Sequence, residues 1–215
     1  MTAWVLAGVV GAAVASGASA NAEVRPGAGS GLTIAVDLTD NVHVPPQELA
    51  EAEDRVAASY RAVGIDVVWH AAPAMSGTPA GPWRIIPVRV VLVPHDKAEA
   101  KCDQEGLGQT VTGIAVSGAP DARGRIAYIF YNRLERLALT QGAPVSRGLG
   151  HVMAHEIGHL LLGVNSHSHD GLMQPNWLPR ETHVQTLTKD QVRAVWRRFA
   201  ESETVAHSGA EPTLP

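Results

Sequence analysis

The sequence predicts an α+β fold in which a twisted mixed sheet of about five strands packs on one long helix, with a further helix at the C-terminal end. Three observations predict it. Five short runs are rich in β-branched residues or alternate in polarity, which is typical of strands. Helical patterns lie between the first two runs and after the last one. With 215 residues, 45% of them hydrophobic, the chain is long enough for one domain with a sizeable core.

The elements are expected in a fixed order without an internal repeat. The expected strands are residues 32–38, 65–70, 83–93, 110–117 and 125–131. Pro87 indicates that the third of these is an edge strand or carries a bulge, because proline cannot donate a hydrogen bond to a sheet. The expected helices are residues 45–63, 132–139, 146–163 and 188–200. Gly64 caps the first helix, and the capping-box pattern from Thr188 to Gln191 opens the last.

The two ends of the chain differ in composition from the middle. Residues 1–22 contain no charged side chain, are rich in Ala, Val and Gly, and offer small residues for cleavage at Ala18-Ser19-Ala20. This pattern predicts a secretory signal peptide, and the alternative is an uncleaved membrane anchor, since roughly 20 uncharged residues barely span a bilayer. We then expect a spacer at 23–31, a single domain at 32–201 and a disordered tail at 202–215. The mature protein is expected to be secreted or periplasmic and free of the membrane.

Charge and cysteine content argue against two other classes of protein. The 17 basic residues are scattered and the formal net charge is −4, so no nucleic-acid-binding surface is indicated. Cys102 is the only cysteine, which excludes an intramolecular disulfide. Its surroundings favour a plain free thiol over a thiolate that masks a metal.

The run His155-Glu156-Ile157-Gly158-His159 is the strongest chemical signal in the chain. On a helix, residues four apart lie about 40° apart around the axis, so His155 and His159 share a face and can bind one tetrahedral ion. Glu156 is rotated by about 100°, close enough to reach a water on that ion without being a ligand. Apolar residues gather on the opposite side of the helix, where they can pack against a core.

Two histidines do not complete a zinc site, and three later residues compete for the third position. The helix must end near Gly163, because glycine takes a left-handed conformation cheaply and sends the chain back towards the metal. His167 is then the first histidine able to reach. His169 is a rival, since residues two apart in an extended segment point the same way, and Asp170 could also bind zinc.

Other candidates have weaker patterns. His151 lies one turn before His155 and is expected to line a cleft or to support the ligands. Glu181 could be a late ligand as in thermolysin-like enzymes, but the residue four positions on is Gln185, so the companion pattern is missing. The remaining histidines have no partner pattern and are expected to be ordinary: His43, His70, His95, His183 and His207.

The motif as a whole resembles the metzincin zinc endopeptidases: His155-Glu156-x-x-His159, then Gly163, His167-Ser168 and Gly171-Leu172-Met173. The order of strands and helices over residues 32–200 is also similar to that family. The resemblance implies that Met173 lies beneath the metal in a tight turn and that substrate lies along an edge strand, here residues 110–117 or a neighbour. In two places the chain departs from the family pattern: both glycine spacings are four instead of three, and Asn165 stands where the strict pattern has histidine. No tyrosine follows directly after Met173.

Resemblance and residue chemistry lead to the same expectation. The chain is expected to be a secreted zinc-dependent endopeptidase with His155, His159 and His167 as metal ligands. Glu156 would act as general base on a zinc-bound water, and the substrate would be a peptide or protein. The alternatives are a zinc hydrolase acting on a non-peptide substrate and a non-catalytic zinc module. Glu156 counts against the second, because a structural site has no use for a base.

Overall fold

The computed structural model describes residues 31–70, 84–106, 108, 110–117, 125–163, 165–175 and 182–207. The predicted signal peptide, most of the spacer and Glu181 lie outside the described residues. None of the helices within them is long and apolar enough to cross a membrane.

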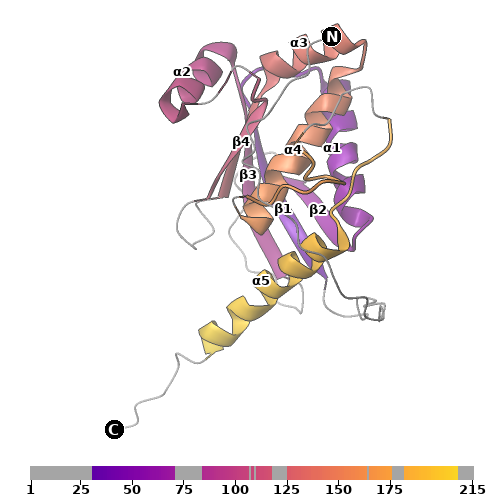
Figure 1. Ribbon diagram of the computed structural model, residues 1–215, viewed down its shortest axis with the longest axis vertical. Helices are drawn as coiled ribbons and strands as arrows, with labels where there is room; N and C mark the ends of the chain where they lie inside the picture. The colour runs from indigo at the N-terminus through magenta and orange to yellow at the C-terminus, as the bar shows by residue number, and fades with distance from the viewer. Residues whose placement is uncertain are drawn as a thin grey trace.

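The predicted α+β class and five-stranded mixed sheet are confirmed (Figure 1). The strands are β1 (Leu32–Asp40), β2 (Ile65–His70), β3 (Arg84–Val93), β4 (Gly113–Ser117) and β5 (Arg125–Phe130). The helices are α1 (Pro46–Arg61), α2 (His95–Glu105), α3 (Tyr131–Gln141), α4 (Val145–Leu162) and α5 (Lys189–His207). The sheet order is β2-β1-β3-β5-β4, and only the β4–β5 pair is antiparallel. β4 therefore forms an antiparallel edge of an otherwise parallel sheet.

Pro87 lies in an inner strand, so its interpretation as an edge-strand residue was wrong. β3 pairs with β1 from Arg84 to Leu92, with Pro87 opposite Ala35. The pairing of β3 with β5 begins only at Arg89. At Pro87, β3 is therefore paired with β1 but not yet with β5. The missing N–H of a proline destabilises the sheet little at such a position.

Alternate side chains of the sheet divide the interior into two clusters. The main core lies on the face covered by α1 and α4, which run side by side (Figure 1). β3 contributes to it Ile86, Val88, Val90 and Leu92, and α4 contributes Leu149, Met153, Ile157 and Leu160. The burial of each such side chain stabilises the fold by about 1.5–3 kcal/mol. This packing fixes α4 firmly against the sheet.

The helix α2 was not predicted, because its sequence has no apolar stripe. Of the α2 side chains that the structure describes, only Ala98 and Cys102 are buried, in a small cluster with Val93 and Phe130 on the opposite face of the sheet. The available signals were local: Pro94 before the first turn, and Gly106 after the last, with a left-handed φ of 64°. Cys102 is a free, buried thiol.

The last helix is longer than expected. α5 continues to His207 instead of ending near residue 200, so the predicted tail at 202–215 begins inside it. No glycine or proline occurs between residue 200 and Gly209, which leaves nothing in the sequence to stop the helix earlier. The predicted capping box at its start is confirmed by reciprocal hydrogen bonds between Thr188 and Gln191.

Candidate metal centre

Three histidine side chains converge at the C-terminal half of α4. The Nε2 atoms of His155 and His159 are 3.1 Å apart, and His167 Nε2 is 3.2 Å from His159 Nε2. The ligand atoms of all three lie within 4.8 Å of one another. Nitrogens bound to one tetrahedral zinc at 2.0–2.1 Å are separated by about 3.3 Å, so two of the three separations are close to those of a metal site. The triad can therefore hold a metal ion.

Hydrogen bonds at the far side of two rings direct their Nε2 lone pairs to the centre of the triad. His155 Nδ1 is 2.8 Å from the carbonyl oxygen of Leu172. A carbonyl can only accept, so Nδ1 carries the proton and Nε2 of the neutral ring keeps its lone pair. His159 Nδ1 is 3.0 Å from Ser166 Oγ, which can accept in the same way. Such partners fix both the tautomer and the orientation of metal-binding imidazoles.

The chain turn after α4 explains how His167 returns to the other two histidines. α4 ends at Leu162, and Gly163 follows with φ 97° and ψ −179°. This extended conformation with positive φ is open essentially to glycine alone. It differs from the left-handed helical conformation that the sequence predicted for Gly163. Asn165 then takes φ 61°, a conformation that asparagine tolerates better than most residues. Asn165 stands where the family pattern has histidine, and here it forms part of the turn. The turn accommodates the longer spacing between His159 and His167.

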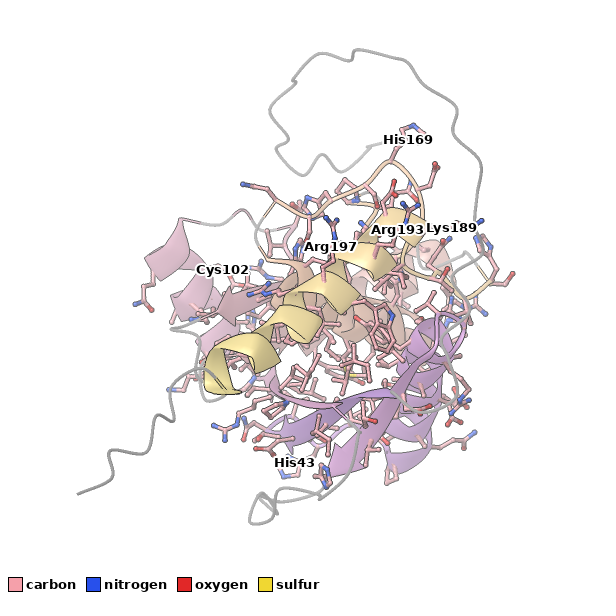
Figure 2. The ribbon with its side chains drawn as sticks, turned by 90° about the horizontal axis from the view of Figure 1, so that it is seen from below. His43, Cys102, His169, Lys189, Arg193 and Arg197 are labelled. Atoms are coloured by element: carbon pink, nitrogen blue, oxygen red, sulfur yellow. The ribbon has the colours of Figure 1, made fainter. Side chains whose placement is uncertain are left out.

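The structure brings His167, and not His169 or Asp170, to the other two histidines. The side chain of His169 is 97% exposed, and its Nδ1 lies within hydrogen-bond distance of Asp170 Oδ1, at 3.0 Å. Figure 2 shows His169 on the outside of its loop, pointing away from the body of the protein. His167 and His169 were expected to point the same way only if the segment between them were extended, and it is folded. Ser168 donates from its backbone N to Met173 O and from Oγ to Asp170 O.

A tight turn that packs against α4 carries Met173. This side chain is fully buried, and a β-carbon added to Gly158 would overlap its sulfur. Gly171 opens the turn with φ 78°, and Leu172 N donates to Thr186 O at 2.8 Å. The same turn supplies the Leu172 carbonyl that orients His155. The packing of Met173 against α4 and the orientation of His155 therefore depend on the same short segment.

Glu156 lies beside the triad and against the edge strand β4. Its side chain is buried, and it is not a member of the three-residue group. A β-carbon added to Gly113, the first residue of β4, would be 2.9 Å from Glu156 Cγ and 3.0 Å from Oε1. Desolvation by burial raises the pKa of Glu156 to about 8. The carboxyl group is thus a buried acid–base group between α4 and the edge of the sheet.

Desolvation also favours the neutral form of the three imidazoles. Desolvation lowers the pKa of His155 to about 4, against the opposing effect of its hydrogen bond to Leu172. Desolvation, followed by the nearby His155 and His167, lowers the pKa of His159 to about 3. The pKa of His167 is lowered for the same first reason. Uncharged imidazoles are the form that binds a metal ion.

Among the residues that the structure describes, no other histidine joins the three-residue cluster. His151 is buried, with its ring centroid 6.2 Å from that of His155, and desolvation holds its pKa well below the usual value. His43, His95 and His183 are exposed. Sequence reasoning missed the supporting roles of Ser166, Gln191 and Gly113 at the centre. Ser166 and Gly113 belong to no spacing motif, and Gln191 was recognised only as part of the capping box of α5.

No protein-family model matches this chain, and no curated protein matches it. Among solved structures, the chain is similar to the solution structure of TM1509 from Thermotoga maritima, described as VT1, a NESGC target protein. The two share 14% sequence identity with a TM-score of 0.36, over 84% of this chain and 99% of that one. A likeness at this level carries no argument about function. The functional case therefore depends on the three histidines and Glu156.

Proposed function

We propose that this protein is a zinc-dependent endopeptidase of the metzincin kind. His155, His159 and His167 are the metal ligands in this proposal, and Glu156 is the general base. The observation that carries it is the convergence of three neutral imidazole nitrogens beside a buried carboxyl group at the edge of a sheet.

The donor set fits zinc and a catalytic role. Imidazole nitrogen suits zinc, whereas magnesium and calcium prefer oxygen ligands. Three protein ligands leave one of four tetrahedral positions open, which is typical of catalytic zinc sites, while structural sites are closed by four. Three neutral ligands also leave the ion its full charge.

Glu156 is placed to move the proton that hydrolysis requires. Zinc, when bound, supplies Lewis-acid chemistry by lowering the pKa of water and polarising a carbonyl group. A cation held by His155, His159 and His167 would favour the ionised form of Glu156, opposing the effect of burial on its pKa. Glu156 takes a proton from the attacking water as the new C–O bond forms, and returns it to the amine nitrogen as the C–N bond breaks. The peptide is thereby split into an acid and an amine.

The edge strand β4 supports a peptide as the substrate. Within the described sheet, β4 is paired only with β5, and an extended chain can add to such an edge through main-chain hydrogen bonds. Gly113 of this strand lies against Glu156, so a peptide on β4 would pass close to the base.

Metal analysis combined with a substrate panel tests the proposal. We expect one zinc per chain by elemental analysis, and cleavage of an unfolded protein that stops on chelation and returns with zinc. Cleavage of esters but not of peptides would instead show a hydrolase with a non-peptide substrate. Stoichiometric zinc without any turnover would show a binding module.

We also propose that the protein is exported and loses an N-terminal signal peptide, by cleavage after Ala20 or, as a second choice, after Ala22. The support is the uncharged, small-residue composition of that segment. N-terminal sequencing of protein recovered outside the cytoplasm should begin near Asn21 or Glu23, and an intact Met1 in that fraction would contradict cleavage.

A further inference from the structure

The third histidine of the triad differs from the other two in how it is held. His155 and His159 project from α4, whose position is fixed by the main core. His167 is exposed and belongs to the loop that follows the helix. A ligand on a loop keeps its geometry only if other residues fix the backbone on both sides of it.

One side chain binds both sequence neighbours of His167. Gln191 Nε2 donates to the backbone oxygen of Ser166 at 3.0 Å and to Ser168 Oγ at 3.1 Å. These are the residues immediately before and after the ligand. Gln191 lies in the first turn of α5, more than 20 residues further along the chain.

The orientation of the Gln191 amide is set by its other contact. Gln191 Oε1 accepts from the backbone N of Thr188 at 3.0 Å, which identifies that atom as the oxygen. Both N–H groups of the amide then point to the loop. Gln191 N in turn donates to Thr188 Oγ1 at 3.3 Å, which completes the capping box.

The loop is tied to the rest of the centre as well. Ser166 Oγ contacts Nδ1 of His159, and Ser168 N donates to Met173 O. α5 itself is anchored to α4, because Arg198 donates to the carbonyl of Leu161 at 3.0 Å and Val195 is fully buried in the main core. Gln191 therefore joins the loop to a helix whose own position is fixed.

We propose that Gln191 is a positioning residue for the metal site, and that the first turn of α5 serves to hold His167 in place. This inference rests on metal binding by the triad, and not on the hydrolytic reaction. Cap formation alone does not require the amide, since glutamate also serves in a capping box. Only glutamine combines an acceptor for Thr188 with donors for Ser166 and Ser168.

Two substitutions separate the two roles of this residue. In Gln191→Glu the carboxylate can still accept from Thr188 N, but it cannot donate to the loop and faces the carbonyl of Ser166. In Thr188→Val the cap hydroxyl is lost, while the amide of Gln191 and its two donors remain. The first change should affect metal binding and the second should affect only helix stability.

Zinc affinity is measured by competition with a chromophoric chelator, together with urea unfolding of the metal-free protein and the visible spectrum of the cobalt-loaded form. We expect Gln191→Glu to weaken zinc binding about 10–100-fold and to change the cobalt spectrum. Thr188→Val should lower the urea midpoint and leave zinc affinity within about twofold. Should Gln191→Glu fail to fold, Gln191→Met replaces it; this variant removes the acceptor for Thr188 and the two donors together, so unchanged zinc affinity in it would also overturn the inference.

Three results would overturn the inference, and they point to different errors. Wild-type protein that binds no zinc would remove the proposed function and this inference together. If the wild-type protein binds zinc and Gln191→Glu binds it equally well, this inference alone is overturned. An equal loss of affinity in Gln191→Glu and Thr188→Val would show that the helix cap, and not donation to the loop, supports the site.

Discussion

Met173 packs directly beneath Gly158 of α4, so that a β-carbon on Gly158 would overlap the Met173 sulfur. Gly158 lies between the two helical histidines, and Met173 follows the residue whose carbonyl orients His155. The packing of the helix on the turn and the geometry of the metal centre are therefore one structural feature.

Gly158→Ala should destabilise the protein by about 1–3 kcal/mol, because the added methyl group has no room above Met173. It should also weaken metal binding, since the displaced turn carries the carbonyl that holds His155. The measurements are urea unfolding of the metal-free protein and a zinc competition assay.

Gly148 in the same helix provides the control. A β-carbon there would meet Leu134 at 3.7 Å, an ordinary contact. Gly148→Ala should therefore stabilise the helix by about 0.5–1 kcal/mol and leave zinc affinity unchanged. Equal behaviour of the two variants would mean that Met173 does not pack against Gly158 as described.

Glu156→Gln should preserve the fold and metal content but reduce peptide hydrolysis by roughly 10²–10⁴-fold, because the amide cannot take a proton. The substitution is nearly isosteric, so the close contact with Gly113 is kept. Elemental analysis and kcat for a peptide substrate are the two readouts. Turnover near that of the wild type would assign the base to another residue.

The metal-free protein should be most stable near pH 6.5. The pKa values of His155 and His159 fall from 6.5 to about 4 and about 3 in the folded state, so below pH 6.5 the unfolded chain binds more protons and stability decreases. The pKa of Glu156 rises from 4.5 to about 8, so its unfavourable ionisation lowers stability as pH rises through that range. Between pH 4.5 and 6.5 the two histidines outweigh the single carboxyl group.

Urea unfolding from pH 4 to pH 9 in the presence of a chelator measures this dependence. In Glu156→Gln the decline above pH 6.5 should be reduced, while the decline below it persists. A wild-type stability that is flat between pH 4 and pH 6.5 would contradict the account of the buried histidines.

Arg133→Met should cost about 1–3 kcal/mol of stability, because it removes a buried guanidinium group from its ion pair with the partly exposed Glu99 and from two backbone carbonyls. The guanidinium group of Arg133 donates to Glu99 at 2.9 Å and to the carbonyls of Gly108 and Val111 in the segment that leads to β4. The exposed Arg136 on the same helix is the control, and Arg136→Met should change the unfolding free energy by no more than about 0.5 kcal/mol. Similar losses in both variants would mean that Arg133 is not buried as described.

The parts of this structure that repeat a simple spacing could be predicted from the sequence. The four-residue interval between His155 and His159 placed both on one helix face, and β-branched content or alternation located all five strands. α2 could not be predicted in the same way, since only Ala98 and Cys102 of that helix reach a core. The prediction for Pro87 was wrong because the effect of a proline depends on where the neighbouring strand begins to pair. The pairing of β3 with β5 begins only at Arg89, and no local sequence pattern predicts that start.

The supporting residues of the centre escaped prediction for a related reason. Ser166 and Gln191 act through contacts to backbone and ring atoms that only the folded chain brings near. Gly163 was correctly identified as the turn residue, but its extended conformation with positive φ depends on the path of the loop after it.

The choice of His167 as third ligand is the claim on which the whole account depends, and paired alanine substitutions test it most directly. Zinc affinity is measured by chelator competition for His167→Ala and His169→Ala, with both variants checked for an unchanged fold. His167→Ala should lose affinity steeply, because its Nε2 lies 3.2 Å from that of His159. His169→Ala should bind zinc as the wild type does, since that side chain is almost fully exposed. A steep loss in His169→Ala with little change in His167→Ala would contradict the account.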